Sequence, residues 1–331
     1  MGRLKIIVIA AMTSNVRRPA ILLSGGLLTL AAGTLLVGRL LAASVPSSVG
    51  PTPPGFEEVH IQSGSGSMLA GWFRPGQRGR GVIVLMHSVR ESRLTMLDRA
   101  GFLSRAGYSV LLFDFQAHGE SPGKHLTFGW LESRDARATV RYARSRCPGE
   151  ALGVIGSSLG GASAILGEEP LGADAVILEA VYPDVEDAVR NRLRIYLGPM
   201  GSPLAPLLLL QFRLWLGISP QDLRPVDHIQ DLGAPVLVIA GTKDRHTTPA
   251  ETRRLFAAAK EPKELWLIEG AAHVDLYRFA GREYEERVLG FWGRTLRSAE
   301  DVADVQLEFR EGQGRDPVAL PELPDVAEAA R

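Results

Sequence analysis

The fold is decided by one stretch of the 331-residue chain, ALGVIGSSLGGASA, residues 151–164. Its first half is a short apolar run that predicts a strand, and its second half is a run of small residues that predicts a closely packed helix. Between them stands the pattern Gly-x-Ser-x-Gly, centred on Ser158. Glycines on both sides permit a tight turn that projects a serine hydroxyl from the end of a strand. We therefore expect Ser158 to be a nucleophile at a strand-to-helix turn.

The same pattern occurs a second time, in Gly119–Gly123 (GESPG). No helix start follows it, and Pro122 favours a loop. Ser157 lies next to Ser158 but lacks the flanking glycines at a distance of two residues. The sequence context therefore selects Ser158 over Ser121 and Ser157.

A serine nucleophile needs a base, and the base needs an acid that orients it. Asp244 follows the apolar run Pro235–Ala240, and His273 follows the run Glu264–Ile268. In a parallel sheet both residues would lie at the carboxyl edge, as Ser158 does, and their order Ser-Asp-His is that of one known class of triad. We predict the catalytic residues Ser158, Asp244 and His273. Asp184 or Asp187 as the acid, and His246 as the base, are the alternatives.

Short apolar runs alternate with amphipathic ones across the middle of the chain. The predicted strands are Val59–Ser63, Met68–Arg74, Val82–His87, Ser109–Phe115, Leu152–Gly156, Ala175–Glu179, Pro235–Ala240 and Glu264–Ile268. The predicted helices are Leu94–Arg105, Leu131–Arg146, Leu159–Leu166 and Ala250–Ala259. This alternation predicts an α/β fold with a doubly wound, mostly parallel sheet over residues 57–297. In Leu131–Arg146, the charges of Glu132, Arg134, Asp135 and Arg137 predict a solvated helix face.

The interval from residue 183 to 230 interrupts this rhythm. It is too long for an ordinary connection between strands. It includes the very apolar Leu204–Leu216, which contains Leu208 and Phe212. We expect a helical cap over the active-site edge, in which Leu208 and Phe212 bind an apolar part of the substrate.

The N-terminal part of the chain has a different character. Pro19–Gly38 is a run of twenty uncharged residues, long enough for a helix to cross a bilayer. Four basic residues precede it, which by the positive-inside rule predicts that the domain behind it is exported. We expect residues 1–43 to be a cytoplasmic stub and a transmembrane helix. The alternative is a signal peptide, with Ala42-Ala43-Ser44 as the cleavage site and a secreted product.

Residues 44–56 are rich in proline, serine and glycine and predict an extended linker. Residues 298–331 are acidic and predict a disordered tail. The 37 basic and 37 acidic residues balance, so no electrostatic footprint for nucleic acid is present. The single cysteine, Cys147, excludes an internal disulfide and is expected to be inert. No Cys/His cluster has the spacing of metal ligands.

Several motifs, in order, resemble those of bacterial α/β-hydrolases with a short helical cap, among them esterases and serine-aminopeptidase-like members. They are Val84–Arg90 (VLMHSVR), Asp114–Ser121 (DFQAHGES), Gly156–Gly160, Gly241–Asp244 and His273. The resemblance implies the α/β-hydrolase fold and the same triad. It also implies that the backbone N–H groups of Val89 and Leu159 form an oxyanion hole. The chain departs from the family pattern at Ser88, where the family has glycine, and at Gln116-Ala117.

These features together predict a serine hydrolase of the esterase/lipase type (EC 3.1), which needs neither a metal nor an organic cofactor. The Leu-rich cap and the anchor suggest a lipophilic carboxylic ester or thioester as the substrate. A serine peptidase is the second hypothesis. A non-catalytic binding protein built on a hydrolase fold is the third. Protein partners are not indicated by the sequence.

Overall fold

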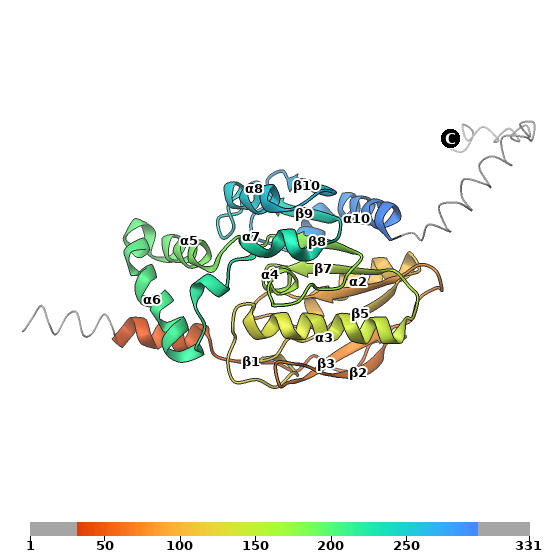
Figure 1. Ribbon diagram of the computed structural model, residues 1–331, viewed down its shortest axis with the longest axis horizontal. Helices are drawn as coiled ribbons and strands as arrows, with labels where there is room; N and C mark the ends of the chain where they lie inside the picture. The colour runs from red at the N-terminus through yellow and green to blue at the C-terminus, as the bar shows by residue number, and fades with distance from the viewer. Residues whose placement is uncertain (1–31, 297–331) are drawn as a thin grey trace, which may run out of the picture. The chain divides into compact units, whose positions relative to one another are not determined.

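The computed structural model describes residues 32–296, and its centre is an eight-stranded sheet (Figure 1). The strand order is β10-β9-β8-β7-β4-β5-β3-β2. All neighbouring strands are parallel except at one edge, where β3 runs antiparallel to β5 and β2 antiparallel to β3. The strands are β2 (Glu57–Gln62), β3 (Met68–Arg74), β4 (Val82–Met86), β5 (Ser109–Phe113), β7 (Leu152–Ser157), β8 (Ala175–Glu179), β9 (Val236–Gly241) and β10 (Lys263–Ile268). The predicted mostly parallel sheet is confirmed, and each of its strands coincides with a predicted run to within two residues.

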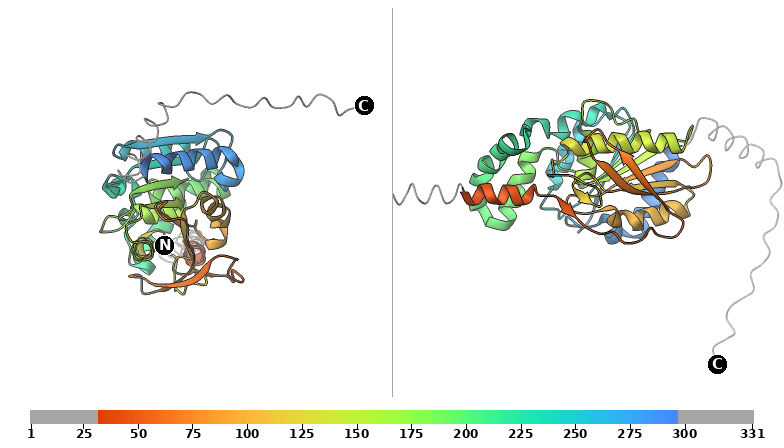
Figure 2. Two further views of the ribbon diagram at one scale, coloured as in Figure 1. Left: turned by 90° about the vertical axis from the view of Figure 1, so that its right-hand side faces the viewer. Right: turned by 90° about the horizontal axis from the view of Figure 1, so that it is seen from below.

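Helices cover both faces of the sheet, which explains why its central strands are apolar throughout (Figures 1 and 2). On one face lie α3 (Trp130–Arg146), α4 (Leu159–Ile165) and α8 (Pro249–Ala258). On the other lie α2 (Leu97–Arg105), α9 (Leu276–Ala280) and α10 (Arg282–Thr295). Successive residues of β4 alternate between the two cores, with Val84 in one and Leu85 in the other. The sheet is therefore a buried scaffold that presents the ends of its strands.

The prediction of a solvated charged face on Leu131–Arg146 is wrong for three of its four charges. Glu132, Asp135 and Arg137 are buried, and only Arg134 is exposed. Glu132 accepts hydrogen bonds from the backbone N–H groups of Thr127 and Gly129, and Asp135 accepts one from that of Gln116. The buried charges thus fix the loop before α3. Helical periodicity shows which residues share a face, but not whether a polar loop covers that face.

Between β8 and β9 the chain leaves the sheet and forms a helical excursion (Figure 1). It consists of α5 (Val185–Leu197), the 3₁₀ stretch Gly198–Leu204, α6 (Ala205–Gln211) and the π-helical turn Phe212–Leu216, and we call Val185–Leu216 the cap. Three short helical turns follow, Pro220–Asp222, α7 (Pro225–His228) and Ile229–Leu232. Within residues 32–296, the cap is the one helical stretch long and apolar enough to cross a membrane. However, α5 and α6 pack against each other, so the stretch is folded back on itself.

A further helix, Ala32–Leu41, lies beside the cap in two views (Figures 1 and 2). After it the chain joins the domain, where β1 (Val45–Pro46) pairs with β6 (His118–Gly119) and Val49 is buried. The predicted linker 44–56 is therefore tied to the domain in its first residues. Of the predicted anchor Pro19–Gly38, residues 19–31 lie outside the described part of the chain, as does the predicted tail 298–331.

Candidate active site

Ser158 stands at the turn between β7 and α4, as predicted from its motif. Its backbone has φ 46° and ψ −104°, a strained conformation for a residue with a side chain. The turn is held by a hydrogen bond of 2.7 Å from the Ser158 N–H to the carbonyl oxygen of Glu179, at the end of β8. Strain that is maintained in this way is characteristic of a nucleophile held out of its strand.

The glycines of the motif are required by close contacts. A Cβ at Gly160 would overlap the carbonyl oxygen of Met86 on β4. A Cβ at Gly156 would lie 2.6 Å from the backbone nitrogen of Gly161. At Gly161 it would overlap Val181. The first turn of α4 can therefore lie directly on the sheet only because these three positions have no side chain.

Asp244 and His273 are joined by a hydrogen bond of 2.7 Å between Oδ2 and Nδ1. Asp244 follows β9 and His273 follows β10, two neighbouring parallel strands. The other oxygen of Asp244, Oδ1, accepts hydrogen bonds from the N–H groups of His246 and Thr247, at 2.8 and 2.9 Å. Because both oxygens are held, the carboxylate fixes the orientation of the His273 ring and places its proton on Nδ1.

The three predicted triad residues follow the carboxyl ends of parallel strands, β7, β9 and β10, and so lie at the same end of the sheet. Ser158 borders one cavity, and His273 borders a second one that Ser157 and Ala180 also line. Within residues 32–296, no direct hydrogen bond joins the Ser158 hydroxyl to His273. Catalytic hydrogen bonds are often long before substrate binds and tighten in the complex. The pair Asp244–His273 is thus assembled, and Ser158 lies at the same end of the sheet.

Val89 and Leu159 border the same cavity as Ser158. Leu159 is the first residue of α4, where backbone N–H groups have no partner within the helix. In the described part of the chain, the N–H of Val89 also donates to no protein acceptor. Two free donors beside the serine are what an oxyanion needs.

His87 fixes the loop that carries Val89. Its Nδ1–H donates to the carbonyl oxygen of Ser88 at 2.7 Å, and its Nε2 accepts from the N–H of Phe115 at 3.1 Å. Burial, together with the neighbouring His118, lowers the pKa of His87 to about 3. The ring is therefore neutral and structural. The positive φ of this loop, 61°, falls on Arg90, two residues after the family's glycine position at Ser88.

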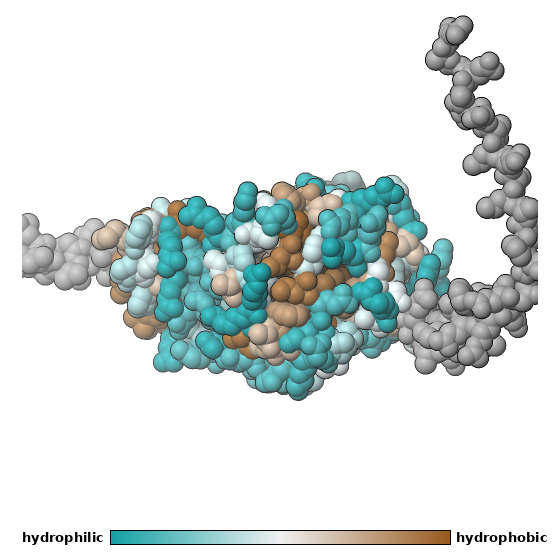
Figure 3. Space-filling view, turned by 90° about the horizontal axis from the view of Figure 1, so that it is seen from above, coloured by the Kyte–Doolittle hydropathy of each residue, from teal (hydrophilic) through white to brown (hydrophobic). Residues whose placement is uncertain are grey.

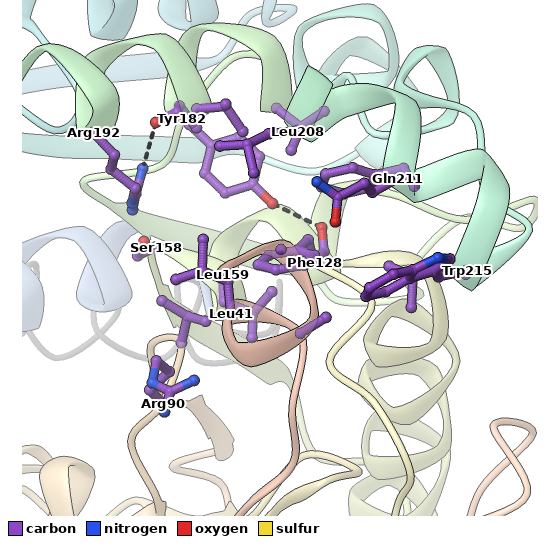
Figure 4. A pocket seen from close by; sticks show the side chains of 18 residues that line it. Leu41, Arg90, Phe128, Ser158, Leu159, Tyr182, Arg192, Leu208, Gln211 and Trp215 are labelled. Carbon is purple, nitrogen blue, oxygen red and sulfur yellow. Dashed lines mark hydrogen bonds between the residues drawn. The ribbon is translucent and has the colours of Figure 1, made fainter. Parts of the chain in front are cut away.

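The cavity beside Ser158 has a volume of about 160 Å³ and a mostly apolar wall (Figure 4). Leu208 and Phe212, the predicted substrate-binding residues, both line it and come from α6 and the following turn of the cap. Tyr182 and Phe128 contribute further rings, and the Tyr182 hydroxyl donates to the Phe128 carbonyl oxygen at 2.8 Å. The sequence analysis missed the remaining apolar lining residues Leu41, Ala42, Val185, Ala188, Val189, Trp215 and Leu216.

Two arginines also line this cavity, Arg192 and the exposed Arg90, whose guanidinium donates to the Leu40 carbonyl oxygen at 3.5 Å (Figure 4). Arg192 donates to the Ala188 carbonyl oxygen at 3.0 Å, and burial lowers its pKa. Among the described residues it forms no ion pair with a carboxylate. No Asp or Glu lines the cavity. The charged side chains that line this cavity are therefore basic, which no pattern in the sequence indicated.

The alternative residues have other roles. Asp184 caps α5 and, like Asp187, binds Arg254. The His246 ring lies 5.0 Å from that of His273. The bond from His246 to Asp244 comes from the backbone N–H of His246 and not from its ring. Ser121 donates to the Asp114 carbonyl oxygen and accepts from the Ala70 N–H, so it is a structural residue.

Cys147 is buried at the end of α3, and burial raises the pKa of its thiol. Over residues 32–296, no group of three or more His, Cys, Asp or Glu side chains is placed to hold a metal ion. The Cys147 thiol is therefore shielded and disfavoured from ionising.

Comparisons with known proteins agree with this architecture. The family model described as serine aminopeptidase, S33, matches residues 77–220. An uncharacterised protein of Mycobacterium tuberculosis is 29% identical over 259 residues, which cover 77% of this chain and 85% of the relative. An α/β-hydrolase domain-containing protein of Arabidopsis thaliana is 24% identical over 249 residues, 71% of this chain and 78% of the relative.

Among solved structures, an esterase of Pyrococcus furiosus is similar, with a TM-score of 0.64 and 23% identity over 77% of this chain and 98% of that one. At this identity the likeness concerns the fold. Together with the ordered motifs, the strand order and the strained turn at Ser158, these matches show that the chain belongs to the α/β-hydrolase superfamily.

Proposed function

We propose that the protein is a serine esterase that cleaves lipophilic carboxylic esters or thioesters through an acyl-enzyme. Ser158 attacks the carbonyl carbon while His273 Nε2 takes the hydroxyl proton, and Asp244 stabilises the imidazolium that forms. The N–H groups of Val89 and Leu159 bind the oxyanion. His273 then returns the proton to the leaving alcohol or thiol. A water molecule, deprotonated in the same way, releases the acid and restores Ser158.

The observation that carries this proposal is the constellation at the sheet edge. A serine in a strained turn borders an apolar cavity, and at the same end of the sheet an aspartate holds a histidine at 2.7 Å. A residue held with φ 46° keeps this conformation only if the surrounding structure enforces it. A binding protein without catalysis has no need of the strain or of the oriented histidine.

The apolar wall of the cavity favours esters over peptides. An aminopeptidase binds the α-ammonium group of its substrate, for which a carboxylate is the natural partner. The charged residues around this cavity are Arg90 and Arg192, which would repel an ammonium group. An uncharged acyl chain, in contrast, matches the side chains of Phe128, Leu208 and Phe212.

We also propose that Pro19–Gly38 anchors the enzyme in a membrane, with the catalytic domain outside the bacterial cytoplasm. The uncharged run and the basic residues before it support this location. Such an anchor would bring the apolar cavity close to lipids.

Labelling with a fluorophosphonate tests the catalytic assignment. We expect the probe to modify Ser158, as mapped by mass spectrometry, and Ser158→Ala to abolish both labelling and p-nitrophenyl butyrate hydrolysis. Asp244→Asn should lower kcat by about 10⁴-fold, because the His273 tautomer is no longer fixed. Ser157→Ala should retain activity as a matched control. Hydrolysis at the wild-type rate by Ser158→Ala would refute the proposal.

A further inference from the structure

The cavity beside Ser158 is not closed by the cap and the sheet alone. Gly38, Leu41 and Ala42 line it as well, and they come from the end of the helix Ala32–Leu41 and the residue after it. In the close-up view, Leu41 lies on the side of Leu159 and Arg90, across the cavity from Leu208 (Figure 4). The segment that was expected to be only an anchor therefore contributes a wall of the substrate site.

A buried glutamine fastens this helix to the cap. Gln211, at the end of α6, donates from Nε2 to the carbonyl oxygen of Thr34 at 2.9 Å and to that of Leu207 at 3.2 Å. Only 5% of its surface is exposed. Gln211 Oε1 is buried without a hydrogen-bond partner among the described residues, so the amide depends on the bonds of Nε2. Burying Nε2 without a partner would be costly, so its bond to Thr34 favours this position of the helix.

Gly38 makes the close approach possible. A Cβ at this position would overlap the side-chain amide of Gln211. At Gly33, about one and a half turns earlier in the same helix, an added Cβ would have no atom within 4 Å. The two glycines therefore differ in their surroundings, and only Gly38 is a contact point between the helix and the cap.

Further interactions hold the helix Ala32–Leu41 in place, along its side and directly after its end. The Arg39 guanidinium lies over the Trp215 ring, 5.7 Å from its centroid. Directly after the helix, Ala43 forms a bridge with His125 and Val45–Pro46 pairs with β6. The helix is thus held by the cap on its side and by the domain at its end, which is more than a tether requires.

We propose that the helix Ala32–Leu41 is a working part of the active site, which closes the acyl-binding cavity and sets the length of acyl chain that it accepts. The inference rests on the proposed esterase function. It also implies that the N-terminal segment is retained, because cleavage at Ala42-Ala43-Ser44 would remove Gly38 and Leu41 and open the cavity on one side. The anchor and the substrate site are then one structural unit.

Two matched pairs of variants in the full-length protein test this inference. Leu41→Trp fills the cavity from the helix side, whereas Leu36→Trp adds the same ring to a position that is 59% exposed and does not line the cavity. Gly38→Ala places a methyl group on the side-chain amide of Gln211, so that the helix or the glutamine must move, whereas Gly33→Ala adds the same methyl group in open space. The readout is kcat/KM for p-nitrophenyl acetate, butyrate, octanoate and dodecanoate.

We expect Leu41→Trp to lower kcat/KM for octanoate about tenfold or more relative to kcat/KM for acetate, since room for two methylenes is worth roughly that factor. Gly38→Ala should change the preferred chain length, and both control variants should match the wild type. If the preference is the same in all four variants while Ser158→Ala is inactive, the inference fails and the esterase function stands. If no ester is cleaved, the rate at which decyl and ethyl fluorophosphonates label Ser158 provides the same comparison.

Retention of the segment is tested on the protein isolated from its own membranes. We expect its N-terminal peptides, identified by mass spectrometry, to include residues 32–43. A mature chain that begins at or after Ser44 would overturn the inference, because the proposed wall would be absent from the working enzyme.

Discussion

His87 is a buried residue whose hydrogen bonds require the neutral form of its ring. The side chain is fully buried, and both ring nitrogens are used by backbone groups, those of Ser88 and Phe115. A proton on Nε2 would remove the acceptor for the Phe115 N–H and place a charge in the core. The resulting pKa of about 3 compares with about 6.5 in an unfolded chain.

This difference predicts a pH dependence of stability that belongs to His87. Between pH 6.5 and 3 the unfolded chain binds one proton at this residue that the folded chain does not. Its contribution to stability is therefore complete above pH 6.5 and is lost as the pH falls. From pH 7.5 to 5.5, we expect the free energy of unfolding to fall by about 1 kcal/mol more in the wild type than in His87→Gln, as measured by urea denaturation.

His60→Gln is the control, because His60 is an exposed histidine on β2. It should show the pH dependence of the wild type. Asp135 has the opposite effect on the pH dependence of stability. Burial raises its pKa to about 7, so below that pH the folded chain binds a proton at Asp135 that the unfolded chain does not, and its contribution to stability rises as the pH falls. Only the difference between wild type and variant isolates His87, and equal pH profiles for the two would contradict the assignment.

At the scale of elements, the strands were the most predictable part of the molecule. Runs such as Val82–Met86 and Ala175–Glu179 are apolar because helices cover both faces of the sheet. Each strand can therefore be recognised from its own residues, without knowledge of the rest of the chain. The positions of Ser158, Asp244 and His273 beyond strand ends could be predicted for the same reason, because each follows such a run. The mostly parallel sheet then brings their strand ends to one edge.

Elements that depend on contacts between distant segments were not predictable. The buried charges of α3 are stabilised by a loop. The helix Ala32–Leu41 is positioned by Gln211, which lies 177 residues after its bonding partner Thr34. A run of Leu, Ala and Gly has the same composition whether it lies in lipid, in a core or against a cap. The sequence indicated that the segment is apolar, and only the fold indicates what it contacts.

The cap gives a prediction of its own, because Leu208 and Phe212 line the cavity and Leu210 does not. Each methylene that the substrate buries there is worth about 0.8 kcal/mol, so four further carbons contribute up to about 3 kcal/mol. We expect kcat/KM to rise from C2 to C6 or C8 esters, and the rise to be reduced in Leu208→Asp and Phe212→Asp. Leu210→Asp, at a position 52% exposed on the same helix, should behave like the wild type. Rates that fall steadily from acetate upward, with all variants alike, would exclude this role.

The whole molecule combines the cap and the N-terminal helix into one apolar end. Exposed Leu35, Leu36 and Leu40 of the helix lie next to a cap that exposes Leu207, Leu210, Leu214 and Trp215. Hydrophobic residues are visible at this end of the molecule in the space-filling view (Figure 3). Exposed apolar surfaces of this kind are typical of sites that contact a membrane or another protein.

The position of the helix restricts how the proposed anchor can sit in a bilayer. Residues 32–38 are the last part of the run Pro19–Gly38, and they lie against the cap. Residues 19–31 alone, at 1.5 Å per residue, would span about 20 Å, less than the hydrocarbon core of about 30 Å. If the run spans the membrane, the cap must therefore dip into the bilayer surface beside it.

We accordingly expect a fluorophore on the cap to report contact with lipid. Cys147 is buried, so an environment-sensitive dye coupled to Leu214→Cys labels one accessible position. Arg80→Cys is the matched control. Arg80 is exposed and precedes β4, so it lies at the amino ends of the strands, whereas Ser158 lies at their carboxyl ends. When the full chain is transferred from detergent into vesicles, quenching by lipids brominated near the headgroup should affect the dye at position 214 and not at position 80. Quenching at neither position would mean that the cap stays in water and that substrates reach Ser158 from the aqueous side. Equal quenching at both positions would contradict a contact with lipid that is confined to the cap.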